Sequence, residues 1–331
     1  MILKDSDIII RTATDNDKYN IIELLNNVFK DQQHTDYTRD DNYYNWKFID
    51  SPFGESILTV CEHDRKIIGV DNLWSWNLII QDKVHLVYEA CDAVVGKEYR
   101  GNGILKKMRT HGIEKAKLNS ASFLFNFPNE QSLKSNINYG YSYLGKLKWW
   151  VKIINPIKTT QILLNLKSNN DKTYSSVDEL PIDVELLLKL SLKYKPTHLI
   201  IIDRTFDFFY YRYLNHPSRH YKMITFKNEI VAIYTINDNY GKREMFITDI
   251  IGNKKYINDL LKEIISMSRS LKCAFVAMVS DNYMLDNSLW LKGFIKKKEK
   301  NMAVYQIKEK IGVDIKNFRS WNLSASLHDS I

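Results

Sequence analysis

The chain repeats itself about halfway along. Residues 46–52 (WKFIDSP) are matched by residues 211–217 (YRYLNHP), 165 positions later in a chain of 331. Each copy leads into two apolar runs around a short polar turn, which is the pattern of a β-hairpin. These runs cover residues 57–61 and 66–70 after the first copy and residues 221–226 and 230–236 after the second. A repeat of this length predicts two similar α/β units in tandem, because each copy is long enough to build a sheet with its helices.

The periodicity of apolar residues predicts mixed β-sheets flanked by helices, an α/β (α+β) fold. Strands are expected at residues 7–11, 56–61, 66–76, 84–95, 122–127 and 141–154, and helices at residues 17–30, 102–119 and 130–139. We therefore expect an N-terminal unit over residues 1–155, a helical linker over 156–195, a second unit over 196–311 and a tail over 312–331.

Composition and charge narrow the classes of protein. Apolar residues make up 44% of the chain and charged residues 26%, as in soluble proteins with a packed core. No stretch is apolar enough for membrane insertion, and the first residues lack the order of a signal peptide, so we expect a cytoplasmic protein. The three cysteines have no metal-binding spacing, so neither a metal site nor disulfides are expected. The net charge of +8 is spread along the chain, which favours small anionic ligands over nucleic acid.

The strongest chemical signal is a strand, a glycine-rich turn and a helix between residues 84 and 117. The turn reads Arg100-Gly101-Asn102-Gly103. Glycines let backbone N–H groups face outward, and the first turn of the following helix adds a partial positive charge, so the segment suits a pyrophosphate. An ordinary glycine-rich corner is the alternative interpretation of these four residues.

Together with the residues after it, this turn resembles the pyrophosphate motif of the GNAT acyltransferases, Arg/Gln-x-x-Gly-x-Gly/Ala. Arg100 and Gly103 match the motif, and Asn129 stands 11 residues before a Gly-Tyr pair, like the residue that starts a later helix in that family. Leu105 replaces the usual small residue, so its side chain must point away from the phosphates. The resemblance implies an acyl-CoA-dependent N-acyltransferase. The implied acyl-CoA contacts are Val94, Val95, Arg100, Gly101, Asn102, Gly103, Ile104, Leu105, Asn129 and Ser132.

The second half of the chain carries no such motif. Its corresponding strand, residues 244–251, is followed by GNKKY at residues 252–256. We therefore expect one acyl-CoA site, in the N-terminal unit, and a degenerate C-terminal GNAT-like unit that shapes the acceptor pocket. Two-unit members of the superfamily include N-myristoyltransferases, mycothiol synthases, peptidoglycan aminoacyl transferases and sugar-nucleotide N-acyltransferases.

The resemblance implies a proton acceptor on the strand at residues 84–95. Acyl transfer to an amine requires an unprotonated nitrogen, a base and hydrogen-bond donors for the oxyanion. Glu89 is the first candidate base, because it resembles in strand position the glutamate of the histone-acetyltransferase branch and its apolar neighbours favour proton uptake. Asp92 is the competitor, on the opposite strand face by alternation. Either carboxylate is alternatively structural.

The departing thiolate also needs a proton. Many GNAT members place a Tyr seven residues after the Asn that starts the later helix, and Asn136 stands there instead. An amide can hydrogen-bond a thiolate but cannot give up a proton at neutral pH. Asn136 therefore only stabilises the sulfur, or Tyr139 or Tyr141 is the donor, or solvent supplies the proton. Asn129 has a second interpretation as a helix cap.

Aromatic residues are expected to bind the acceptor. They make up 12% of the chain, and a cleft lined by rings suits a nucleobase or a sugar face. The candidates are Trp46, Trp74, Trp76 and Tyr211, each of which also fits ordinary packing. With the positive net charge, they favour an amino sugar linked to a nucleotide.

The overall pattern resembles bacterial sugar-nucleotide N-acyltransferases. These enzymes move an acetyl or 3-hydroxybutanoyl group from CoA to the amine of a dTDP-linked 3-amino-3,6-dideoxyhexose for surface polysaccharide. Other interpretations stay open: a GNAT enzyme for another amine, like mycothiol synthases or peptidoglycan aminoacyl transferases, or a non-catalytic acyl-CoA-binding protein. The sequence leaves the oligomeric state open, a homodimer included.

Overall fold

The computed structural model describes residues 3–29, 39–164, 179–239, 242–280 and 283–327. The chain divides into two compact units. Unit 1 contains Met1–Gly145 and Asn301–Lys316, and unit 2 contains Lys146–Lys300 and Asn317–Ile331. Each unit is thus built from two separate segments, whereas the sequence predicts consecutive units with borders at residues 155 and 196. Residues 165–178 of the expected linker and residues 328–331 of the expected tail lie outside the described residues.

Two long strands account for this division. β6 (Ser142–Ile153) begins in unit 1 and continues into unit 2, where it pairs with β11 (Phe275–Ser280). β12 (Ile295–Gln306) begins in unit 2, and its last residues pair with β5 (Phe123–Asn126) of unit 1. Each unit therefore includes a strand that begins in the other. Such pairings join residues far apart in the chain and leave no signal in the periodicity of a single strand.

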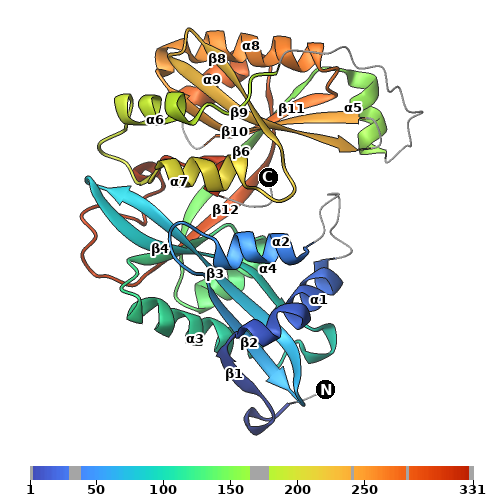
Figure 1. Ribbon diagram of the computed structural model, residues 1–331, viewed down its shortest axis with the longest axis vertical. Coiled ribbons are helices and arrows are strands. Elements are labelled where there is room, and N and C mark those ends of the chain that lie inside the picture. Colours follow the sequence, from blue (N-terminus) through green and yellow to red (C-terminus); the bar gives the residue numbers. More distant parts are fainter. Residues whose placement is uncertain (1–2, 30–38, 165–178, 240–241, 281–282, 328–331) are drawn as a thin grey trace. The chain divides into compact units, whose positions relative to one another are not determined.

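The sheet of unit 1 has the strand order β1-β2-β3-β4-β5-β12 (Figure 1). Its other strands are β1 (Ile9–Thr12), β2 (Ile57–His63), β3 (Lys66–Ile80) and β4 (Lys83–Val95). β1 to β4 pair antiparallel, whereas β4 and β5 pair parallel. The β2–β3 and β3–β4 hairpins turn through two left-handed residues each, Asp64-Arg65 and Gln81-Asp82, a geometry that matches the twist of the strands.

Helices cover both faces of this sheet. They are α1 (Lys18–Phe29), α2 (Asp41–Tyr44), α3 (Ile104–Leu118) and α4 (Glu130–Asn138). On β3, Val70 joins the apolar cluster under α1, and Leu73 joins the cluster under α3. Residues of opposite parity in a strand point to opposite faces, so α1 and α3 lie on opposite faces of the sheet. α2 passes directly into a π-helical turn, η4 (Asn45–Ile49).

Unit 2 has the strand order β6-β11-β10-β9-β8 (Figure 1). Its further strands are β7 (Ile201–Ile202), β8 (Tyr221–Phe226), β9 (Ile230–Asn239) and β10 (Lys242–Gly252). Its helices are α5 (Pro156–Leu163), α6 (Val184–Lys193), α7 (Phe206–Phe209), α8 (Ile257–Ser270) and α9 (Tyr283–Leu291). β10 and β11 pair parallel and the other neighbours antiparallel. α7 continues into a π-helical turn, η6 (Tyr210–Leu214), as α2 continues into η4.

Candidate active site

In unit 1, β4 separates from β5 partway along its length. The parallel pairing between them joins Tyr88 to Leu124 and Glu89 to Phe125. β5 ends one residue later, whereas β4 continues to Val95. No strand of the described chain pairs with this side of β4 beyond Glu89, so its backbone groups there are available to a ligand.

Beyond β4 the chain reaches the glycine-rich turn. A 3-10 turn, η5 (Lys97–Tyr99), is followed by residues 100–103 and then by the first turn of α3. Gly101 and Gly103 have φ angles of 86° and 69°, in the left-handed region that favours glycine. A Cβ at either position would have no other atom within 4 Å, so the turn faces open space. An anion therefore has access to the unpaired N–H groups at the start of α3.

Side chains around the turn hold it in place. Arg100 Nε donates to the carbonyl oxygen of Val95 at 3.1 Å, and Asn102 Nδ2 donates to the carbonyl oxygen of Tyr99 at 2.9 Å. Ile104 is buried, and Leu105 packs against the same apolar cluster. Leu105 thus points toward the core, as its departure from the motif requires. Of the remaining implied contacts, Val94 is buried beneath α1 and Val95 packs against the Ile104 cluster.

Glu89 lies where β4 and β5 separate. The residue is 1% exposed and stands opposite Trp74 of β3 and Phe125 of β5. The carboxyl group is therefore held away from solvent, beside the separation of the two strands.

Asp92 lies at a β-bulge that the sequence did not predict. Between the pairs Val70–Val94 and Asn72–Cys91, β4 has one residue more than β3. Asp92 has a φ angle of 47°, a left-handed conformation that is uncommon outside glycine. The extra residue shifts the alternation of side chains along β4 by one position.

The bulge therefore corrects the expectation that Asp92 and Glu89 face opposite sides. The Asp92 carboxylate lies 2.5 Å from Nζ of Lys47 and 3.4 Å from a guanidinium nitrogen of Arg39. Lys47 Nζ also lies 5.0 Å from the ring centroid of Trp74, the residue opposite Glu89. Both carboxylates are thus on the face that carries Trp74. Two cations engage the oxygens of Asp92, so Asp92 is less available as a base.

A comparison with family models agrees with this geometry. Residues 9–143 match the model of the acetyltransferase (GNAT) domain. The N-terminal unit carries a GNAT acetyltransferase domain. The matched domain supports an acyl-CoA-dependent N-acyltransferase activity of the GNAT type. No curated protein matches the chain in sequence.

Solved structures share the GNAT fold over most of the chain. A GCN5-related N-acetyltransferase from Anabaena variabilis is 14% identical with a TM-score of 0.61, and the match covers 90% of this chain and 72% of that one. A probable N-acyltransferase from Enterococcus faecalis is 12% identical with a TM-score of 0.64, and the match covers 91% of this chain and 72% of that one. The N-myristoyltransferase of Saccharomyces cerevisiae with bound myristoyl-CoA is 9% identical with a TM-score of 0.62, and the match covers 96% of this chain and 87% of that one. At these identities the likeness shows the fold alone.

The four candidate residues at α4 lie at its two ends. Asn129 caps the GNAT domain's α4, because its Oδ1 accepts a hydrogen bond from the backbone N–H of Ser132 at 2.8 Å. Ser132 itself is exposed. Asn136 is buried near the other end, and its Nδ2 has no hydrogen-bond partner among the described residues. Tyr139 follows at the C-cap and is half-buried. Asn136 thus offers a buried donor, and Tyr139 a more accessible hydroxyl.

Tyr141 belongs to a buried network that sequence reasoning missed. Arg109 of α3 donates to both oxygens of Asp71 on β3, at 2.7 and 2.5 Å, and to the hydroxyl of Tyr141 at 2.9 Å. Burial alone would disfavour its charge, but the attraction of Asp71 raises the pKa of Arg109, while burial raises the pKa of Asp71. Burial raises the pKa of Tyr141. This tyrosine is therefore a core residue of the GNAT domain.

The three tryptophans expected to bind the acceptor pack on one another. Trp74 and Trp76 have no exposed surface, and Trp46 is 4% exposed. Their ring centroids are 5.6 Å apart for Trp46 and Trp74 and 4.8 Å apart for Trp74 and Trp76. The arrangement is a wall of rings packed at an angle to one another rather than an open cleft, since Trp74 and Trp76 share one face of β3 and η4 covers it. Tyr211 is buried in unit 2.

Unit 2 has a similar β-bulge in β10, but different side chains surround it. β10 and β11 pair in parallel as far as Ile247 with Met278, and a register shift follows between Ile247 and Asp249. Arg204 donates to both oxygens of the buried Asp249 at 2.8 Å. Arg204 follows Arg39 by 165 positions, the spacing of the repeat. Both units therefore pair an arginine that precedes the repeated segment with an aspartate at a bulge.

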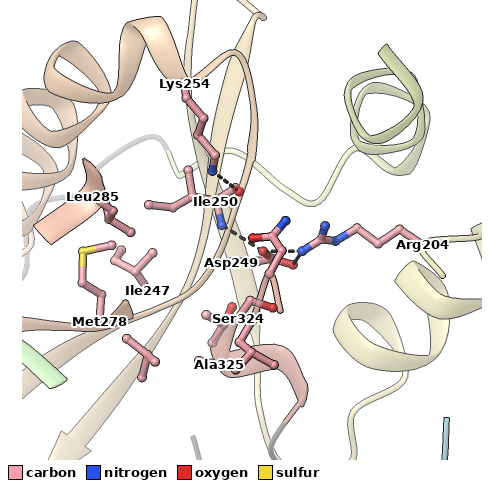
Figure 2. Close-up of a pocket in the computed structure, with 13 residues that line it drawn as sticks. Arg204, Ile247, Asp249, Ile250, Lys254, Met278, Leu285, Ser324 and Ala325 are labelled. Atoms are coloured by element: carbon pink, nitrogen blue, oxygen red, sulfur yellow. Dashed lines mark hydrogen bonds and ion pairs between the residues drawn. The ribbon is translucent and has the colours of Figure 1, made fainter. Parts of the chain in front are cut away.

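A pocket lies at the bulge of unit 2 (Figure 2). Ile247 and Met278 line one side, and the Asp249–Arg204 pair lies on another. Residues 322–325 of the C-terminal segment also line it, and the backbone nearby is tied down by a hydrogen bond from Lys254 Nζ to the carbonyl oxygen of Ile250. The pocket is thus bordered by the chain's own C-terminal segment.

In the described parts of the chain, no helix has the length and apolar character needed to cross a bilayer. Nor, within these residues, does any group of three or more His, Cys, Asp or Glu side chains come together to hold a metal ion. The three cysteines are free thiols. Burial raises the pKa of Cys61 to about 11 and that of Cys273 to about 12, so both stay protonated at neutral pH.

Proposed function

We propose that unit 1 transfers an acetyl or 3-hydroxybutanoyl group from CoA to the amine of a nucleotide-linked amino sugar. A dTDP-3-amino-3,6-dideoxyhexose is the acceptor class, used in the cytoplasm for surface polysaccharide. The observation that carries the proposal is the open turn at Gly101 and Gly103, next to the unpaired end of β4. Pyrophosphate bound at the turn and pantetheine bound along residues 90–95 bring the thioester toward Glu89.

Glu89 acts as the base in this proposal. It takes a proton from the amine, directly or through water, as the nitrogen attacks the thioester carbon. The C–N bond forms, the C–S bond breaks, and CoA leaves as a thiolate that takes a proton from Tyr139 or solvent. Asn136 hydrogen-bonds the sulfur, and backbone N–H groups at the end of β4 stabilise the oxyanion.

The acceptor class rests on charge and resemblance. A net charge of +8 attracts a nucleotide diphosphate. Trp46 and the fully buried Trp74 and Trp76 support this proposal as a rigid wall on the Glu89 face of the sheet. We further propose that unit 2 is a degenerate GNAT-like unit with no acyl-CoA site of its own, because η7 (Lys254–Tyr256) runs directly into α8 without a glycine turn.

A thiol-release assay tests the proposal. The purified chain is given acetyl-CoA, 3-hydroxybutanoyl-CoA or myristoyl-CoA, the last because a structural neighbour has that ligand bound. The acceptors are dTDP-linked amino sugars, a cysteinyl pseudo-disaccharide and short peptides. We expect release that depends on one amino sugar. Release with the pseudo-disaccharide or a peptide alone would overturn the acceptor class, and acetyl-CoA binding without turnover would favour a non-catalytic protein.

A further inference from the structure

The bulge in β4 is held from outside the strand. Asp92 has a left-handed conformation within a strand, where most residues are extended, and contacts from outside the strand hold it there. The Asp92 side chain is 6% exposed and bonded to Lys47, which has no exposed surface. Lys47 Nζ also donates to the hydroxyl of Tyr43 at 3.1 Å. The ion pair holds Lys47 and Asp92 against each other, because breaking a buried ion pair by removing one partner is costly.

Lys47 itself lies on a rigidly packed element. It belongs to η4, a π-helical turn, which is a rare conformation often found at functional sites. Its neighbour Trp46 packs edge-on against Trp74 at 5.6 Å. The ion pair therefore connects η4 to β4 at the residue where the strand changes direction.

The repeat supplies a natural contrast. Arg212 of η6 stands 165 positions after Lys47 and is also fully buried. It donates to the carbonyl oxygen of Ser326 and to the hydroxyl of Tyr221, both at 2.9 Å. Arg212 therefore contacts the C-terminal segment and β8, and it serves as the matched control for Lys47.

We propose that Lys47 is a positioning residue for acyl transfer. Through Asp92 it fixes the course of residues 93–95, the part of β4 that receives pantetheine. It also lies over Trp74, the ring opposite Glu89, and so fixes the wall next to the base. This inference rests on the function proposed above, because it assigns a role only if acyl-CoA binds along the end of β4.

Hydrogen–deuterium exchange of the full chain, with and without saturating acetyl-CoA, tests the proposal. In the wild type we expect acetyl-CoA to slow exchange over residues 90–96 and residues 100–107. In Lys47→Met the protection of residues 90–96 falls by about fivefold or more, while that of residues 100–107 is kept. We expect Lys47→Arg to retain most of the protection of both segments, and the matched control Arg212→Met to retain it in full. Unchanged protection of residues 90–96 in Lys47→Met overturns the proposal.

A double variant separates positioning from stability. Lys47→Met with Asp92→Asn removes both buried charges, and Asn tolerates the left-handed conformation. We expect its Tm to return to within about 2 °C of the wild type, while protection of residues 90–96 stays low and kcat with the accepted amine stays at least about tenfold reduced. Recovery of protection together with Tm would make Lys47 merely structural and overturn the proposal. Absence of protection in the wild type at both segments is a different result, which contradicts the proposed function itself.

Discussion

Units 1 and 2 share a parallel strand pair with a bulge and a buried aspartate, but they differ in how the chain continues into the next helix. In unit 1, residues 100–103 separate η5 from α3 and face open space. In unit 2, α8 begins at Ile257, directly after η7. Residues 100–103 have no counterpart between η7 and α8, so we expect the start of α3, and not that of α8, to be accessible to an anion.

The two aspartates at the bulges, Asp92 and Asp249, also differ in the residues that contact them. Asp92 is bound by cations of the segment that precedes β2, Arg39 and Lys47. Asp249 is bound by Arg204 and also accepts a hydrogen bond from Ser326 of the C-terminal segment. In unit 2 the C-terminal segment thus contacts the carboxylate at the bulge. The strand geometry is similar in both units. We therefore infer that a ligand site at the end of the strand depends on which side chains lie there.

The largest effect is expected from Gly103→Glu. Its carboxylate faces the pyrophosphate, and its φ angle of 69° disfavours a side chain, so the Kd for acetyl-CoA rises about 100-fold or more. Calorimetry measures this. Gly103→Asn is the matched control, since asparagine tolerates the conformation without a charge and keeps Kd within about fivefold. Equal affinity of wild type and Gly103→Glu would remove the turn from the site.

Glu89→Gln is expected to lower kcat about 100-fold with little change in the Kd for acetyl-CoA, because it removes the base but keeps the shape. The loss shrinks as the pH rises, since more of the acceptor amine is then unprotonated. The matched control is Glu244→Gln on β10, also a buried carboxylate opposite a phenylalanine of the neighbouring parallel strand. A similar kcat loss for both variants would break the contrast between the units.

Arg204→Met is expected to affect stability alone. It leaves Asp249 as an uncompensated buried charge, which costs about 3–5 kcal/mol of unfolding free energy. Denaturant unfolding measures this, and the Kd for acetyl-CoA stays within about twofold. Lys262→Met, at an exposed ion pair with Asp259, serves as control with no measurable change. Loss of acetyl-CoA binding in Arg204→Met would show that unit 2 contributes to the site.

The smallest effect is expected at α4. Asn136→Ala lowers kcat by about threefold to tenfold, the worth of one hydrogen bond to the thiolate. Tyr139→Phe lowers it by less than about threefold if solvent supplies the proton. Ser288→Ala on α9 of unit 2 is the control and leaves kcat unchanged. A larger loss in Tyr139→Phe than in Asn136→Ala would identify Tyr139 as the proton donor.

Features set by neighbouring residues could be predicted from the sequence. β4 and α3 begin and end within two residues of the expected ranges, because apolar periodicity and the glycine turn are local signals. Glu89 is buried, as its apolar neighbours indicated. The direction of Leu105 toward the core also followed from the motif.

Features set by strand pairing could not be predicted. The bulge at Asp92 exists only relative to β3, so the sequence placed this residue on the wrong face. Trp74 and Trp76 were expected to line a cleft, although their shared parity also allowed the packing that the structure has. A lysine among aromatic residues at position 47, repeated as an arginine at position 212, was the available signal for a buried cation.

We propose that the chain has one acyl-CoA site, at the glycine turn of unit 1. Calorimetric titration of the full chain with acetyl-CoA tests this, because the number of sites follows from the titration itself. We predict one acetyl-CoA bound per chain. Two bound per chain, or none, would overturn the assignment of a single site to unit 1.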